Sequence, residues 1–219
     1  MRKIAVLTGD LIGSTESPPG VLEATMARLS AAAGEVAGWT GARSGPENTH
    51  FTRYRGDGWQ MVVTDPALAL RAALFLLARL RAGKGLLDSR IAIGIGAAES
   101  LGSAGLSDAR GAAFEASGRG LDGIGRQRQL AVAGEGVTAL HEVIVDLLEE
   151  HARHWTREQA EAAALWLDPA NPTLADVAPR LGISPQAVNY RLSGGSVQAI
   201  RRALAGWEAG FAEAEGRAR

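Results

Sequence analysis

The sequence contains no cysteine among its 219 residues. A disulfide framework, a thiolate nucleophile and a cysteine-ligated zinc or iron–sulfur site are therefore excluded. The net charge is only −1, so a nucleic-acid-binding surface would have to be local. Long apolar runs are lacking too: the strongest, residues 72–78, lies between Arg71 and Arg79. A membrane span needs about 20 apolar residues, so we expect a cytoplasmic protein with no membrane partner.

The hydrophobic pattern of the first part of the chain predicts alternating strands and helices. We expect strands at residues 2–8, 49–55, 59–64, 89–97 and 129–133, and helices at residues 21–39, 65–82, 111–121 and 137–154. The order is strand-helix-strand-strand-helix-strand with an added helix-strand-helix, which is typical of a ferredoxin-like α+β sheet domain. We place this domain at residues 1–154.

Residues 155–219 show no strand pattern, and they predict a small all-α domain. A helix is expected at residues 156–167, followed by a break at residues 168–172 and two or three short helices.

Two acidic residues stand where strands are expected to end. Asp10 follows the first strand, and Asp57 lies in the Gly56-Asp57-Gly58 turn between the next two strands. In this topology the first strand lies beside the hairpin, so the two carboxylates can converge. Two neighbouring carboxylates repel each other, and a divalent cation such as Mg²⁺ or Mn²⁺ would relieve that cost. Glycine and aspartate are also ordinary turn residues, so a purely structural role is the alternative.

The segment from Asp10 to Thr15 resembles the first metal motif of the class III nucleotidyl cyclases, and Arg55-Gly56-Asp57-Gly58 resembles the second. The resemblance implies that Asp10 and Asp57 bind metal. It also implies a transition-state arginine at Arg119, although Glu115 stands where the cyclases have asparagine. The nucleotide-binding residues that it implies are Leu11, Ile12, Gly13, Ser14, Thr15, Arg53 and Arg55.

The whole chain is similar to the SatD family of bacterial proteins. That family combines a Gly-Asp at the end of the first strand with a Gly-Asp-x-aromatic-Gln motif, which reads Gly56-Asp57-Gly58-Trp59-Gln60 here. An Arg-Ile-Gly-Ile-Gly-type strand and a C-terminal DNA-binding-like region complete the pattern. The resemblance implies a cyclase-like (palm-like) domain followed by a helix-turn-helix.

Residues 173–193 carry the pattern of a helix-turn-helix. Ala178 is small where two helices would cross, Gly182 suits a turn with positive φ, and Ser184 and Pro185 suit the start of a second helix. A single copy would bind DNA weakly, so we expect a homodimer that presents two copies of this helix. The polar side chains that the helix would present to DNA are those of Ser184, Gln186, Asn189, Tyr190 and Arg191.

Three interpretations remain open at this point. The first is a dimeric, DNA-binding transcriptional regulator whose cyclase-like domain binds a metal and a nucleotide. The second is an active nucleotidyl cyclase or nucleotidyltransferase with two Mg²⁺ ions held by Asp10 and Asp57. The third makes both parts protein-interaction modules, with the two acids as turn formers.

Overall fold

The computed structural model describes residues 3–39, 51–54, 56–102 and 105–217. Over these residues the chain forms one sheet of five strands, which are β1 (Lys3–Leu11), β2 (Phe51–Arg53), β3 (Trp59–Val63), β4 (Ser89–Ala97) and β5 (Leu130–Gly134). The α-helices of the same residues are α1 (Val21–Trp39), α2 (Ala69–Arg81), α3 (Ala112–Gly123), α4 (Ala139–Ala152), α5 (Arg157–Trp166), α6 (Leu174–Leu181), α7 (Pro185–Gly194) and α8 (Val197–Arg217). The predicted α+β class is confirmed.

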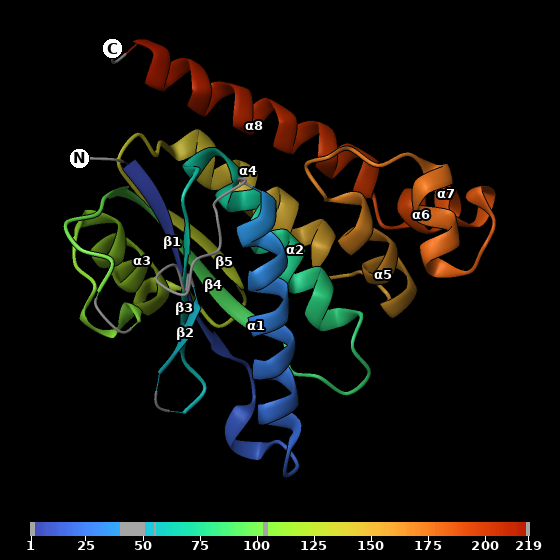
Figure 1. Ribbon diagram of the computed structural model, residues 1–219, viewed down its shortest axis with the longest axis horizontal. Coiled ribbons are helices and arrows are strands. Elements are labelled where there is room, and N and C mark those ends of the chain that lie inside the picture. The colour runs from blue at the N-terminus through green and yellow to red at the C-terminus, as the bar shows by residue number, and fades with distance from the viewer. Residues whose placement is uncertain (1–2, 40–50, 55, 103–104, 218–219) are drawn as a thin grey trace.

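The strands lie in the order β2-β3-β1-β4-β5. The central strand β1 is antiparallel to both β3 and β4, whereas β5 pairs parallel to β4. Helix α3 lies on one side of the sheet, and α1 and α2 lie on the other (Figure 1). Helices α5 to α7 form a group beyond α2, and α8 runs back across the top of the molecule in this view (Figure 1).

Both faces of β1 are buried, which explains its nearly continuous apolar sequence. Ala5 and Leu7 pack in the larger core with α1 and α2, and Ile4 and Val6 pack with Ala113 and Phe114 of α3. The predicted apolar face of α1 is confirmed, because Met26, Leu29, Ala33 and Val36 are all buried. The sheet is thus enclosed between two helical layers.

Helix α3 approaches β4 closely because β4 carries glycine at the contact. A Cβ atom at Gly94 would lie 2.2 Å from the carbonyl oxygen of Ala113 and 2.3 Å from the amide nitrogen of Ser117. The hydroxyl groups of Ser117 and Thr8 are 2.7 Å apart, so a polar contact also joins α3 to β1. The absence of a side chain at Gly94 therefore sets the spacing of this layer.

Three sequence predictions need correction. The first strand continues to Leu11, because its pairing with β4 extends as far as Leu11 opposite Ser89, so Asp10 lies within a strand and not after it. Asp65 caps a 3₁₀ turn, residues 66–68, which leads into α2 at Ala69. Three helices follow residue 172, within the expected two or three, but the last of them, α8, is one long helix of 21 residues and not a short one.

One apolar cluster runs from the sheet into the C-terminal helices. It includes Leu74 of α2, Ala163 of α5, Val188 of α7 and Leu204 of α8. Arg71 of α2, which is 2% exposed, donates to both carboxylate oxygens of Glu208 on α8 at 2.6 and 2.9 Å. The helices after residue 154 therefore pack directly on the sheet-bearing part. Among the described residues, no helix combines the length and apolar character that crossing a membrane requires.

Candidate functional site

Asp10 lies opposite Arg90 in the β1–β4 pairing, on the face of the sheet that also carries Thr8. Arg90 donates to both carboxylate oxygens of Asp10, from Nε at 2.9 Å and from Nη2 through a shorter contact. These hydrogen bonds raise the pKa of Arg90, and the negative charges of Asp10 and Asp57 raise it further against the opposing effect of burial. The charges of both predicted metal ligands therefore stabilise the protonated guanidinium of Arg90.

Asp57 lies at the tip of the β2–β3 hairpin, where Ser14 Oγ donates a hydrogen bond to its Oδ2. Ser14 begins the short 3₁₀ turn that follows Gly13, whose φ of 74° is left-handed. The connection after β1 thus contacts the hairpin tip. The Ser14–Asp57 pair lies near enough to the Asp10–Arg90 pair for the charge of Asp57 to raise the pKa of Arg90, and we call these four residues the Asp10–Asp57 cluster.

The other predicted nucleotide-binding residues after β1 differ in accessibility. Leu11 is buried and packs in the core, so its side chain faces away from solvent. Ile12, Gly13 and Thr15 are exposed, and the amide of Ile12 donates to the carbonyl of Asp88 at 2.9 Å. Only the exposed part of this segment could contact a ligand.

The predicted phosphate-binding arginines do not converge on this cluster in the described residues. Arg53 forms two hydrogen bonds to Glu23 of α1, at 2.7 and 2.9 Å, and these bonds lower the pKa of Glu23 and raise that of Arg53. Arg119 pairs at 3.4 Å with Glu115 one helical turn away, and both side chains are about 70% exposed. Arg55 lies outside the described residues.

The residues present do not form a ready metal centre. Within the described ranges, no group of three His, Asp or Glu side chains is placed to hold a metal ion. Both oxygens of Asp10 already accept from the Arg90 guanidinium. A divalent cation would have to displace that arginine, so the geometry does not fit a two-metal centre without rearrangement.

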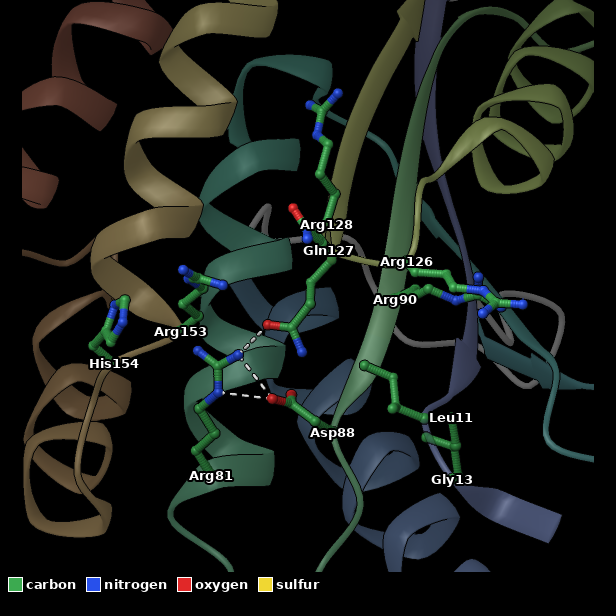
Figure 2. Close-up of a pocket in the computed structure, with 12 residues that line it drawn as sticks. Leu11, Gly13, Arg81, Asp88, Arg90, Arg126, Gln127, Arg128, Arg153 and His154 are labelled. Atoms are coloured by element: carbon green, nitrogen blue, oxygen red, sulfur yellow. Dashed lines mark hydrogen bonds and ion pairs between the residues drawn. The ribbon is translucent and has the colours of Figure 1, made fainter.

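A cleft of about 890 Å³ opens next to the Asp10–Asp57 cluster, and sequence reasoning missed it. Leu11, Ile12 and Gly13 form one part of its wall, and Arg90 also lines it. Its lining includes long basic side chains from α2, β4, the α3–β5 connection and the end of α4; in Figure 2, Arg81 and Arg153 lie on one side of β4 and Arg90 and Arg126 extend past the other. The lining arginines are Arg81, Arg90, Arg126, Arg128 and Arg153. The sequence held one clue to this cleft: two arginines, in Arg126-Gln127-Arg128, stand just before an expected strand in a chain with no net basic charge.

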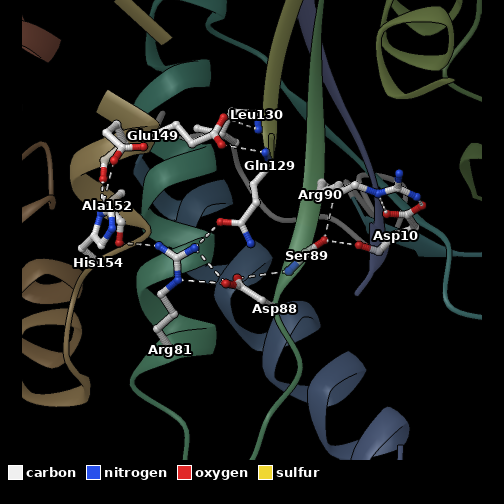
Figure 3. Close-up of polar contacts among 11 residues, drawn as sticks. Asp10, Arg81, Asp88, Ser89, Arg90, Gln129, Leu130, Glu149, Ala152 and His154 are labelled. Carbon is white, nitrogen blue, oxygen red and sulfur yellow. Dashed lines mark hydrogen bonds and ion pairs between the residues drawn. The ribbon is translucent and has the colours of Figure 1, made fainter. Parts of the chain in front are cut away.

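Arg81 fixes the inner part of this cleft. It donates to Asp88 Oδ2 from Nε at 3.0 Å and from Nη2 at 2.8 Å, and it also contacts the side chain of Gln129 and the carbonyl of Ala152. The buried carboxylate of Glu149 accepts from the amides of Gln129 and Leu130 at 2.8 and 2.9 Å (Figure 3). The strand β5, the helix α4 and the helix α2 are therefore held together around the cleft.

The predicted DNA-contacting residues lie on α7, but they differ in how free their side chains are. Ser184 caps the helix, since its hydroxyl accepts from the amide of Ala187 at 3.2 Å. Gln186 is exposed and Tyr190 is 78% exposed. Asn189 accepts a hydrogen bond from Gln198 at 2.8 Å.

Arg191 points back toward the body of the protein. Its Nη1 lies 3.1 Å from Glu161 Oε2 on α5, and only a quarter of its side chain is exposed. Of the predicted DNA-contacting side chains that follow the cap, Gln186 and Tyr190 are therefore the ones exposed to solvent.

No protein-family model matches the chain. No curated protein matches it either. The function must be argued from the site itself.

Proposed function

We propose that the protein is a DNA-binding transcriptional regulator of the SatD type. In this proposal a ferredoxin-like, cyclase-related domain binds a ligand, and a C-terminal helix-turn-helix binds DNA. The strand order β2-β3-β1-β4, with α1 and α2 on the same side of the sheet, supports the ferredoxin-like assignment. The boundary near residue 154 remains part of the proposal.

The pair of helices α6 and α7 is the observation that carries DNA binding. They are joined by residues 182–184, where Gly182 adopts a φ of 65° and Ser184 starts α7 with a side-chain cap. Such a short turn with a left-handed residue is what a helix-turn-helix requires. The exposed Gln186 and Tyr190 then occupy the first turns of α7, the part of a recognition helix that meets base edges in the major groove.

The charge on this surface is modest, which favours two copies acting together. Arg180 and Arg202 are exposed near α7, whereas Arg191 is paired with Glu161. Few phosphate contacts give weak binding to a single half-site. We therefore propose a homodimer that presents two α7 helices to two half-sites one helical turn apart.

A DNA-selection experiment tests this proposal. Purified protein should enrich a sequence from a randomised duplex pool, and its affinity for that duplex should fall as salt rises. Gln186→Ala should weaken binding to the enriched duplex by about 1–3 kcal/mol, because a glutamine that pairs with a base contributes that much. Arg110→Ala, which removes an exposed charge on the sheet-bearing part, should leave the affinity unchanged. The absence of salt-sensitive binding, or an equal loss in both variants, would contradict the proposal.

The Asp10–Asp57 cluster supports a second component, which is a nucleotide held with Mg²⁺ or Mn²⁺. The supporting observation is that the connection after β1 meets the tip of the β2–β3 hairpin through the hydrogen bond from Ser14 to Asp57. Metal binding would require Asp10 to exchange Arg90 for the cation. The exposed Glu115–Arg119 pair supplies no preformed transition-state group, so we propose ligand binding and keep cyclase activity as the alternative.

Thermal unfolding tests this component. A nucleoside triphosphate with Mn²⁺ at about 100 times its Kd should stabilise the protein by about 2.7 kcal/mol. Asp57→Ala should abolish the gain, whereas Glu142→Ala, which removes an exposed carboxylate on α4, should retain it. Product analysis of the same mixtures separates binding from turnover. An undiminished shift in Asp57→Ala would remove this cluster from ligand binding.

A further inference from the structure

The arginine-lined cleft has an unusual balance of charge. Five arginines line it, and Asp88 is the one carboxylate among its described lining residues. Four of these arginines pair with carboxylates, which are Asp88, Asp10, Asp146 and Glu150, so within the described lining Arg126 supplies the uncompensated positive charge. The cleft therefore offers an anion mainly guanidinium donors.

Carboxylates around the rim hold several of these arginines in place. Arg90 pairs with Asp10, and Arg128 pairs with Asp146. Arg153 Nε lies 2.7 Å from Glu150 Oε2. A guanidinium has five N–H donors, and each of these pairs uses only some of them. The pairs therefore fix the directions of the guanidinium groups while leaving donors for a ligand.

Arg126 is the exception, because no ion pair or hydrogen bond from its side chain is found among the described residues. It is exposed on the α3–β5 connection, and Figure 2 draws it extending beside Arg90. An unpaired arginine next to a paired one raises the local electrostatic potential. A bound anion would be the natural counter-charge.

The arginines come from more than one wall of the cleft. Arg126 and Arg128 lie on the connection before β5, whereas Arg153 lies at the end of α4. Figure 2 shows Arg153 beside the helical wall and Arg126 on the far side of β4. A ligand that engages both walls must carry negative charge at more than one point. Arginine forks match phosphate oxygens bidentately, which favours phosphate over a single carboxylate.

We propose that this cleft binds a polyphosphate that extends between its two walls, with Arg126, Arg128 and Arg153 as its phosphate-binding residues. The volume of about 890 Å³ is within the range of sites that hold small ligands. Arg81 is a positioning residue, because Asp88, Gln129 and Ala152 already occupy most of its donors. The proposal deepens the ligand-binding part of the proposed function, because Ile12 and Gly13 also line the cleft, but it requires neither DNA binding nor a metal at Asp10 and Asp57.

Calorimetric titration with inorganic tripolyphosphate in the presence of EDTA tests the proposal. EDTA removes divalent metal, so failure of the metal component cannot abolish this signal. The wild-type protein should bind saturably. Arg126→Ala and Arg153→Ala should each weaken binding at least about tenfold, the loss expected for a charged hydrogen bond. Arg126→Lys should recover only part of the loss, because lysine keeps the charge but not the bidentate fork.

Arg110→Ala is the matched control. Arg110 is an exposed arginine whose backbone pairs with Glu99 and Ser100. These two residues follow the C-terminal end of β4, whereas Arg90 lies at the N-terminal end of that strand. Its removal should leave tripolyphosphate binding unchanged. Equal weakening in Arg110→Ala, no saturable binding by the wild-type protein, or unchanged binding in Arg126→Ala would each overturn the proposal.

Two further titrants identify the source of the phosphates. Tighter binding of ATP or GTP than of tripolyphosphate would support the proposal and assign a nucleotide. Equal binding of all three would support it and assign recognition to the phosphates alone. Tighter binding of a single-stranded oligonucleotide than of any of these would overturn the small-ligand assignment and make the cleft a nucleic-acid contact.

Discussion

Replacing Glu208 by alanine is expected to lower the free energy of unfolding by about 3–5 kcal/mol. The reason is that Arg71, which is 2% exposed, would lose the carboxylate to which it donates at 2.6 and 2.9 Å. A third bond, to the carbonyl of Leu167 at 3.2 Å, would remain, but a carbonyl does not compensate a buried positive charge. Arg201 adds to the cost, because it lies near enough to Arg71 for the two positive charges to repel each other. This repulsion, after burial, is what lowers the pKa of Arg201.

Urea unfolding followed by circular dichroism measures this effect as a lower midpoint. Glu115→Ala is the matched control, since Glu115 and its partner Arg119 are both about 70% exposed and such pairs contribute at most about 1 kcal/mol. The double variant Arg71→Met/Glu208→Leu should recover much of the loss, because well-packed apolar residues replace a buried ion pair at little cost. A Glu208→Ala protein as stable as the control would contradict this account.

Replacing Gly94 by alanine is expected to lower the free energy of unfolding by about 3 kcal/mol, at the upper end of the range for overpacked cores. The added Cβ atom would lie 2.2 Å from the carbonyl oxygen of Ala113 and 2.3 Å from the amide nitrogen of Ser117. Both obstacles are backbone atoms of α3, so rotation of a side chain cannot relieve the contact. The helix would have to move away from β4, which would also disturb the contact between Ser117 and Thr8.

Gly118→Ala is the control for the same helix. No atom lies within 4 Å of a Cβ at Gly118, so the substitution should stabilise the protein by about 0.5–1 kcal/mol through the higher helix propensity of alanine. Opposite signs for Gly94→Ala and Gly118→Ala in the same urea experiment would verify the packing of α3. A destabilisation of similar size in both variants would show that glycine content alone, and not the α3–β4 contact, sets the effect.

Much of the fold could be predicted because its signals are local. Helix α1 was expected over its observed range of Val21–Trp39, from apolar residues at helical spacing. The start of α7 was equally clear, since Ser184 and Pro185 satisfy the first turn of a helix by themselves. The end of β1 was predicted too early, because Gly9 looks like a strand terminator. In the structure Gly9 lies inside the strand and leaves room for the indole of Trp59.

The candidate site could be predicted only in part. The convergence of Asp10 and Asp57 stays a prediction from the expected strand order; what the structure adds is that both carboxylates raise the pKa of Arg90. Arg90 itself was not expected as their partner. Its position opposite Asp10 depends on the register of β1 against β4, and register comes from the packing of the whole sheet.

By itself, the sequence determined the positions of most helices and strands, the cap of α7 and the absence of cysteine chemistry. Only the tertiary structure decided which charges meet. Arg81, Arg126 and Arg153 have no shared spacing in the sequence, and they line one cleft because α2, β5 and α4 pack together. Periodicity and capping act over a few neighbouring residues, whereas a cleft depends on contacts between segments far apart in the chain. For that reason the arginine-lined cleft emerged only from the folded molecule.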